Sequence, residues 1–375
     1  MRIEKFEMER MQNLYESEVE FNLSVSGVMP LSPRDLLDGK DEVEQFLSAE
    51  LFYSESTGSG LLRERIAGLY PGCLPENVTV TNGTSEANYV TLWTLLEANQ
   101  RMACMLPNYL QAWGIGRAYA AGVDPFHLVL REESGQLRWA LDLDELERAV
   151  TRQTRVIFVN TPNNPTGAIL NRAEMDAVVA AARRVNAWLV VDEVYRGAEL
   201  EGDISPSFWG MYEKVVVTCG MSKAFALPGL RLGWVVAPVK LIEEVWVRHD
   251  YLTLTPGLLS DRLATLALEP TRHAAIRARI RTILQNNLPH FEAWIEPIRD
   301  VVRYVRPQAG AIAYFGYHGS IPSALLAERL HREGSVLVVP GEYFGLERGF
   351  RIGYGMNTEK MKAGLARLQH LMTNL

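Results

Sequence analysis

A lysine and an arginine stand eight residues apart in the stretch VTCGMSKAFALPGLRLGW, residues 217–234, which is otherwise apolar or small. An amine that lies near another cation in a partly desolvated pocket has a lowered pKa and can attack a carbonyl carbon to form a Schiff base. The planar fork of an arginine suits a phosphate group. Lys223 and Arg231 therefore predict a site for a phosphorylated aldehyde.

Small and polar residues also stand where predicted strands end. Gly83, Thr84 and Ser85 lie between a predicted strand and a predicted helix, where free backbone amides favour an anion. A simple helix cap at Thr84 or Ser85 is the alternative. The sequence NTPNNPTG, residues 160–167, is a rigid turn that either directs its amide side chains toward a ligand or has a structural role alone.

A carboxylate follows the next apolar run, in the sequence VVDEVY, residues 190–195. Asp192 is expensive to bury without a cation or a hydrogen-bond donor, although it could also cap a following helix. A lysine that forms an imine, an anion site, an arginine and an aspartate that faces a ring nitrogen are together the parts of a pyridoxal phosphate (PLP) site.

Alternating strands and helices must position these residues. Apolar runs predict buried strands at residues 77–83, 102–107, 154–162, 187–195 and 214–220, and helical patterns separate them, as at residues 84–100 and 171–186. Because the strands lack polar alternation, we expect a largely parallel α/β sheet with both faces covered. Ligands of such sheets bind where loops leave the carboxyl ends of the strands, which is where the polar residues fall.

The pattern changes after about residue 270. A long helix is predicted at residues 271–295, followed by strand-like segments and a last helix. We therefore predict a large domain at residues 41–270, and a smaller α+β domain built from residues 1–40 and 271–375.

Composition excludes several classes of protein. The 375 residues carry a net charge of −7 and no basic stripe, so nucleic-acid binding is not expected. The apolar runs are too short to span a membrane, and the N-terminus lacks the apolar core of a signal peptide. Cys73, Cys104 and Cys219 are scattered without metal-binding spacing, so we expect no metal site and a cytoplasmic protein.

Five segments resemble the motifs of fold-type I PLP-dependent enzymes, and among these the class I/II aminotransferases, in the order that the family has. They include NTPNNPTG, DEVY, SKAFALPGLRLGW and, near the C-terminus, FRIGYG. The resemblance covers nearly the whole chain. It implies a large domain with a mainly parallel sheet of the seven-stranded type covered by helices, a smaller α+β domain and PLP as cofactor.

The resemblance assigns catalytic and cofactor-binding roles to individual residues. Lys223 would form the Schiff base and carry a proton between the substrate and the cofactor, and Asp192 would pair with the ring nitrogen. Asn164 and Tyr195 would hydrogen-bond the 3-oxygen of the ring, and Tyr109 would stack on its face. The phosphate would be held by Gly83, Thr84, Ser85, Ser222 and Arg231.

The same resemblance implies the substrate contacts and a partner. Arg351 would bind the α-carboxylate of an amino acid, with Asn164 nearby, and Gly27 would lie in the segment that closes over the substrate. Tyr53 matches a tyrosine that reaches the phosphate of the neighbouring subunit, which implies a homodimer with shared sites.

The activity that the resemblance implies is transfer of an amino group between an α-amino acid and a 2-oxo acid. A finer similarity, to members like capreomycidine synthase, leaves open β-elimination and cyclisation of an arginine derivative. Decarboxylation, racemisation, oxidation and a PLP-binding regulator without catalysis are more distant alternatives. Ala112 stands where the family often has an aromatic residue, and no second arginine for a dicarboxylic substrate can be identified.

Overall fold

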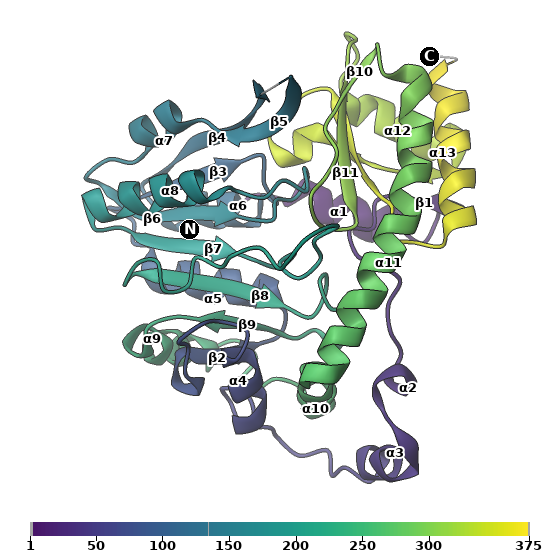
Figure 1. Cartoon of the computed structure of the whole chain (residues 1–375). Helices are drawn as coiled ribbons and strands as arrows, with labels where there is room; N and C mark the ends of the chain where they lie inside the picture. The colour runs from purple at the N-terminus through teal and green to yellow at the C-terminus, as the bar shows by residue number, and fades with distance from the viewer. Residues whose placement is uncertain (1–2, 134, 374–375) are drawn as a thin grey trace.

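The computed structural model describes residues 3–133 and 135–373 and builds them around one large and one smaller sheet (Figure 1). The large sheet has the strand order β2-β9-β8-β7-β6-β3-β4-β5. Its strands are β2 (Val78–Thr81), β3 (Arg101–Leu106), β4 (Gly122–Glu133), β5 (Gln136–Leu141), β6 (Thr154–Asn160), β7 (Trp188–Asp192), β8 (Val215–Gly220) and β9 (Gly233–Val236).

The core of the large sheet is parallel, as predicted. Strands β4, β3, β6, β7 and β8 pair in parallel, whereas β2, β9 and β5 add antiparallel pairs. The expected mainly parallel sheet is thus confirmed, with β5 as an eighth strand at its edge.

Both faces of this sheet are buried, which explains the uninterrupted apolar strands. Because side chains alternate along a strand, Val156 and Phe158 of β6 pack on one face and Ile157 and Val159 on the other. The first pair belongs to a core shared with α5 (Thr84–Leu95) and α6 (Gln111–Tyr119), and the second to a core shared with α8 (Arg172–Val185).

The smaller sheet is antiparallel and has the order β10-β11-β14-β13. Its strands are β10 (Val302–Tyr304), β11 (Ile312–Tyr317), β13 (Val339–Pro340) and β14 (Gly349–Gly353). A further parallel pair, β1 (Phe21–Asn22) with β12 (Val336–Leu337), joins the N-terminal segment to the C-terminal part of the chain. The division into domains at residues 40 and 270 stays a prediction, which we retain as a proposal.

The remaining helices surround the two sheets (Figure 1). They are α1 (Glu7–Tyr15), α2 (Pro33–Leu36), α3 (Gly39–Leu47), α4 (Gly60–Ala67), α7 (Leu143–Ala149), α9 (Val239–His249), α10 (Leu258–Ala267), α11 (Pro270–Ile295), α12 (Ser323–Gly334) and α13 (Thr358–Thr373). The helix expected over residues 84–100 is shorter than predicted, because the chain becomes extended at Leu96 and then turns into β3. Within the described residues, no helix combines the length and the apolar character that crossing a membrane requires.

Candidate active site

Most of the predicted site residues line one cavity of about 610 Å³, and several of them follow β6, β7 and β8. The strand register aligns these ends, because Asn160 pairs with Asp192 and Asp192 pairs with Thr218. The predicted residues in the cavity wall are Thr84, Ser85, Tyr109, Asn164, Asp192, Tyr195, Ser222, Lys223, Arg231 and Arg351.

Lys223 presents its amine to this cavity just after β8 ends. Its Nζ donates a hydrogen bond to Ser26 Oγ at 2.8 Å, so the N-terminal segment reaches the amine directly. Burial, followed by the positive charge of Arg351, lowers the pKa of Lys223 from 10.5 to about 8. The lowered pKa increases the neutral fraction of the amine near neutral pH, which suits a group that must attack a carbonyl carbon.

Asp192 is the buried carboxylate at the end of β7, with 6% of its surface exposed. Asn88 Nδ2 donates to its Oδ2 at 2.9 Å, and the backbone N–H of Val194 donates to its Oδ1 at 3.0 Å. Burial raises the pKa of Asp192 to about 6 despite these two donors. A cation opposite this carboxylate, such as a protonated ring nitrogen, would offset the desolvation.

The anion-binding groups meet at the N-terminus of α5. Gly83 precedes the helix with φ of +90°, and a Cβ built on it would lie 2.6 Å from Arg231 Nη2. Glycine is therefore required for the close approach of the guanidinium to the helix start. Arg231 Nη1 also donates to Ser222 Oγ at 3.4 Å and to the carbonyl of Pro228 at 3.0 Å.

Arg351 of β14 is 1% exposed, and its hydrogen-bond acceptors among the described residues are neutral. Its Nη2 donates to the carbonyl of Ser24, and its Nη1 donates to Asn164 Oδ1 at 3.1 Å. Its guanidinium carbon lies 5.1 Å from the centre of the Phe344 ring. A buried guanidinium with only neutral partners is strongly disfavoured, so this geometry favours binding of an external carboxylate.

Two aromatic residues border the space between these charged groups. The Tyr195 hydroxyl is buried and makes no hydrogen bond of ordinary geometry with another described residue. The Tyr109 hydroxyl donates to Glu9 Oε1 at 2.7 Å, which fixes the ring at the cavity wall. Both side chains are therefore available to a flat ligand.

The residues present fit PLP. Thr84 Oγ1 and the Tyr195 hydroxyl are buried polar atoms that lack partners within the described part of the chain. Such atoms are rare unless a ligand or water satisfies them. An anion site, a lowered-pKa amine and a buried carboxylate lie around them, which matches the phosphate, carbonyl and ring nitrogen of this cofactor.

Sequence reasoning missed the residues of α1 that line the cavity, and it missed the individual contacts of Ser26 and Asn88. Glu9, Gln12, Asn13 and Glu16 line the cavity from α1 and its C-terminal end. Their spacing of i, i+3, i+4 and i+7 places them on one helix face, and this was the signal that could have revealed them. Ser26 on Lys223 and Asn88 on Asp192 left no recognisable signal, because each is defined only by a contact with a distant segment.

Three other residues considered from the sequence lie outside the cavity wall. Gly27 is close by, since a Cβ built on it would lie 3.5 Å from the carbonyl oxygen of Ser222. Tyr53 is 74% exposed, and its proposed role in a neighbouring subunit stays a prediction. Ala112 is buried in α6, and Trp113 beside it lines a different cavity.

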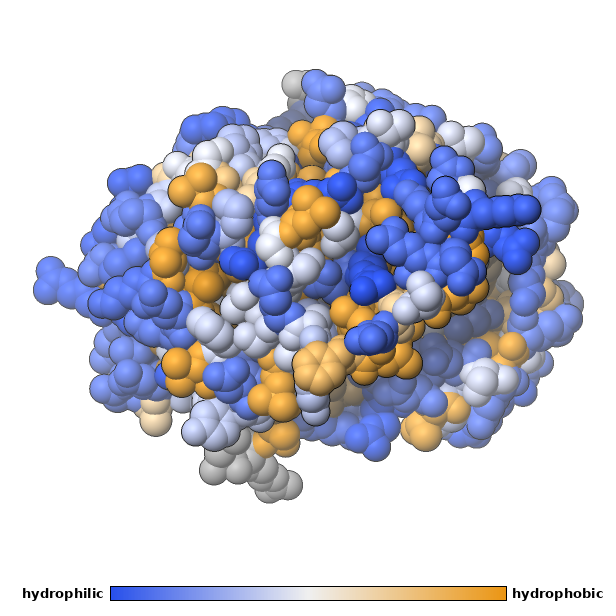
Figure 2. Space-filling view, turned by 90° about the horizontal axis from the view of Figure 1, so that it is seen from below, coloured by the Kyte–Doolittle hydropathy of each residue, from blue (hydrophilic) through white to orange (hydrophobic). Residues whose placement is uncertain are grey.

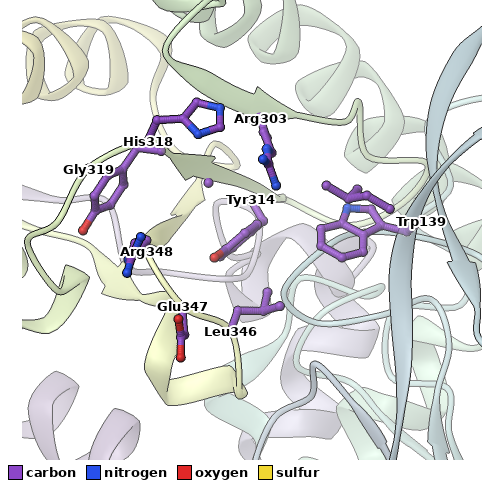
Figure 3. A pocket seen from close by; sticks show the side chains of 11 residues that line it. Trp139, Arg303, Tyr314, His318, Gly319, Leu346, Glu347 and Arg348 are labelled. Carbon is purple, nitrogen blue, oxygen red and sulfur yellow. The ribbon is translucent and has the colours of Figure 1, made fainter. Parts of the chain in front are cut away.

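A separate cavity of about 400 Å³ lies between β4 and β5 on one side and the smaller sheet on the other (Figure 3). Trp139, Arg303 and Tyr314 are among its lining residues, and none of the predicted site residues belongs to it. In the described part of the chain, no cluster of three or more histidine, cysteine or acidic side chains could hold a metal ion.

Known proteins resemble the chain over most of its length. The sequence model of the family described as aminotransferase class I and II matches residues 40–368. Capreomycidine synthase of Streptomyces vinaceus is 31% identical over 338 residues, which are 88% of this chain and 82% of that protein.

Two solved structures share the fold over the whole chain. A PLP-dependent aminotransferase from Streptococcus suis superposes with a TM-score of 0.90 at 28% identity, covering 100% of this chain and 99% of that one. The PLP-dependent cyclase OrfR superposes with a TM-score of 0.88 at 26% identity, covering 100% and 98%.

Proposed function

The chain belongs to the class I and II aminotransferase family, and from this premise we propose that it is a PLP-dependent enzyme that transfers an amino group between an α-amino acid and a 2-oxo acid. One observation carries the proposal. The lowered-pKa amine of Lys223 and the buried guanidinium of Arg351, whose acceptors among the described residues are all neutral, open on the same cavity. An α-amino acid offers the two complementary groups, an amine-bearing carbon and a carboxylate.

The chain's own residues would hold PLP at several points. The amides at the start of α5, Ser222 and Arg231 would bind the phosphate, and Asp192 would pair with the ring nitrogen. Asn164 and Tyr195 would hydrogen-bond the ring oxygen, and Tyr109 would cover one face. When bound, PLP supplies a ring that withdraws electrons from the α-carbon of the amino acid.

The protein would then bind, orient and move a proton. Arg351 would fix the substrate carboxylate in a site from which burial excludes most water, and this contact orients the α-carbon toward Lys223. Because the pKa of Lys223 is lowered toward neutrality, the neutral amine could take up the α-proton and carry it from the substrate toward the cofactor. Ser26 Oγ, which accepts a hydrogen bond from this amine, would hold it in place between transfers.

A second candidate reaction, β-elimination with ring closure, is favoured by similarity to two proteins. The chain is 31% identical to capreomycidine synthase and resembles the PLP-dependent cyclase OrfR in fold. Both reactions begin with removal of the α-proton by the same lysine. They differ in the next step, in which either the nitrogen leaves with the cofactor or a group on the β-carbon departs.

We also propose that the enzyme is a homodimer in which Tyr53 serves the neighbouring site. Figure 2 views the molecule from the side on which α3 and α10 lie and shows apolar patches among the polar residues. Leu51, Phe52 and Tyr53 are 79%, 76% and 74% exposed. The hydrogen bond from Ser54 Oγ to the carbonyl of Pro256 brings them beside a second exposed apolar segment, residues 251–254. Such surface favours a protein partner.

A titration of the PLP-loaded protein with a panel of amino acids tests the proposal. Transamination predicts one equivalent of 2-oxo acid per subunit and retention of the amino group by the cofactor when no acceptor is present. Elimination predicts loss of the β-substituent while the cofactor keeps its starting absorbance.

The variant Lys223→Ala should lose the visible absorbance band of the bound cofactor, and turnover should fall by at least about a hundredfold. Lys214→Ala is the matched control, because Lys214 is half-buried like Lys223, is absent from the cavity wall and donates to Asn186 instead. Full turnover by Lys223→Ala would refute the assignment of the lysine, and no response to any amino acid would refute the function.

A further inference from the structure

The outer wall of the active-site cavity is one polar face of α1. Glu9, Gln12, Asn13 and Glu16 line it together, and the described part of the N-terminal segment carries no lysine or arginine into the cavity. Met8 also borders the cavity, and its side chain is buried against Val339 of β13 and Phe344. The helix is thus anchored by its apolar side and presents two carboxylates and two amides to the ligand space.

Three cations, Lys223, Arg231 and Arg351, border the same cavity. Arg231 lies at the anion site of α5, and Arg351 lies close enough to Lys223 that its positive charge disfavours protonation of the amine. If Arg351 binds the α-carboxylate and Lys223 serves the α-carbon, as proposed above, both are committed to the backbone atoms of the substrate. The side chain of the substrate must then occupy the rest of the cavity, which the polar face of α1 borders.

Glu9 is the carboxylate best placed to act on that side chain. Tyr109 donates to its Oε1, while its Oε2 accepts no hydrogen bond from the described residues. Burial lowers the pKa of both Lys223 and Arg351, and the negative charge of Glu9 opposes that shift in both, which places the carboxylate near the reacting centre. Glu16 adds a second negative charge farther along the same helix face.

We propose that this cavity selects amino acids with a cationic side chain, such as a guanidinium or an ammonium group, and that Glu9, supported by Glu16, is the residue that determines this specificity. The inference rests on the proposed function, because it needs Arg351 and Lys223 to fix the backbone of the substrate. It does not depend on which of the two reactions occurs. Arg351 is an independent indication of a ligand in the same cavity as the two acidic side chains. Its side chain is buried, and its Nε has no hydrogen-bond partner among the described residues.

The same charges argue against dicarboxylic substrates. A second carboxylate on the side chain would approach Glu9 and Glu16 across a partly buried cavity, where like charges repel more strongly than in water. The three cations of the cavity wall would already be engaged by the phosphate, the α-carboxylate and the α-carbon in the proposed function. Glutamate and aspartate should therefore be poor ligands.

The decisive comparison is between arginine and citrulline, which have nearly the same shape but differ in charge. Each is titrated into the PLP-loaded enzyme, and half-saturation of the change in cofactor absorbance is measured. We expect arginine to bind at least about tenfold more tightly than citrulline, because a charge-assisted hydrogen bond contributes on the order of 1.4 kcal/mol or more. The variant Glu9→Gln, which keeps an acceptor for Tyr109, should remove most of that ratio while citrulline binds within about twofold of the unmodified enzyme.

Glu7→Gln is the matched control, since Glu7 lies on the same helix, pairs with Lys5 and is absent from the cavity wall. This variant should leave the ratio unchanged. Equal binding of arginine and citrulline would overturn the specificity while leaving the proposed function intact. Equal weakening of both ligands by Glu9→Gln would assign Glu9 a structural role and overturn its part in specificity. No spectral response to any amino acid would overturn the proposed function itself, and this inference with it.

Discussion

Replacing Lys223 by methionine should stabilise the cofactor-free protein. The lysine amine is desolvated and faces the guanidinium of Arg351, so the folded state disfavours its protonated form and lowers its pKa from 10.5 to about 8. Methionine is similar in length and carries no charge, so it removes this unfavourable interaction. A gain in stability would show that the reactive amine of Lys223 lowers the free energy of unfolding of the cofactor-free protein.

The size of the effect follows from the shift in pKa. One pKa unit corresponds to about 1.4 kcal/mol, so the shift of Lys223 amounts to roughly 3 kcal/mol as an upper bound. Because Lys223 is only partly buried, solvent screening reduces this value, and we expect a gain of about 1–3 kcal/mol at pH 7.

The lowered pKa also determines how the stability difference between the two proteins changes with pH. Between pH 8 and 10.5 the unfolded chain binds a proton at this lysine and the folded chain does not, so the wild-type protein gains stability as the pH rises through this window. The penalty is complete below pH 8 and has vanished above pH 10.5. The advantage of Lys223→Met should therefore be largest at pH 7 and shrink steadily toward pH 10.

Denaturant unfolding of the cofactor-free wild type, Lys223→Met and the control Lys214→Met, at a lysine outside the cavity wall, at pH 7, 8, 9 and 10 measures this difference. Loss of the hydrogen bond to Ser26 and the added apolar contact of methionine change little with pH, so the slope isolates the charge. A stability difference that stays constant from pH 7 to pH 10, or a loss of stability at pH 7, would refute the reasoning.

Two further substitutions test the anion site and the dimer. Gly83→Ala should weaken binding of PLP to the cofactor-free protein by at least about tenfold, since its Cβ would lie 2.6 Å from Arg231 Nη2. Gly72→Ala is the control, because Gly72 also has a positive φ but has nothing within 4 Å of the added Cβ, and unchanged affinity in Gly83→Ala would contradict the geometry. Tyr53→Phe should weaken PLP binding by roughly tenfold to a hundredfold, the value of one lost hydrogen bond to a charged group. Sedimentation should find a dimer, and a monomer that binds PLP tightly would contradict the shared site.

The fold and the central site residues could be predicted because their signals are local. Asp192 and Lys223 each follow an apolar strand directly, and parallel pairing carries such residues to one edge of a sheet whatever the loops do. Gly83 was recognisable from a local signal as well, because it directly precedes a predicted helix. Arg351 could be identified only through the resemblance to a family. The sequence around it does not indicate that β14 carries this residue to the cavity that Asp192 and Lys223 line.

The N-terminal helix could not be placed in the same way. Its polar residues are typical of a solvated helix face, and only the fold reveals that Glu9 meets Tyr109 and that Ser26 meets Lys223. These contacts join segments that are far apart in the chain, so neither periodicity nor motif spacing records them. The side chain of Tyr53 poses a related problem, since a role in a neighbouring subunit leaves no trace in a single chain.

The residues that could be predicted from the sequence and those that could not differ in which property of the enzyme they would determine. In the proposed function, Lys223, Asp192 and Arg351 would act on the α-carbon and its carboxylate, so they would serve every reaction that begins with loss of the α-proton. They cannot by themselves distinguish transamination from elimination. That choice depends on the group carried by the β-carbon and on how the rest of the side chain is held, and the wall that faces it is α1. If the two proposals hold, the chemistry specific to this enzyme would depend on the helix that carries Glu9 more than on the strand ends that carry Asp192 and Lys223.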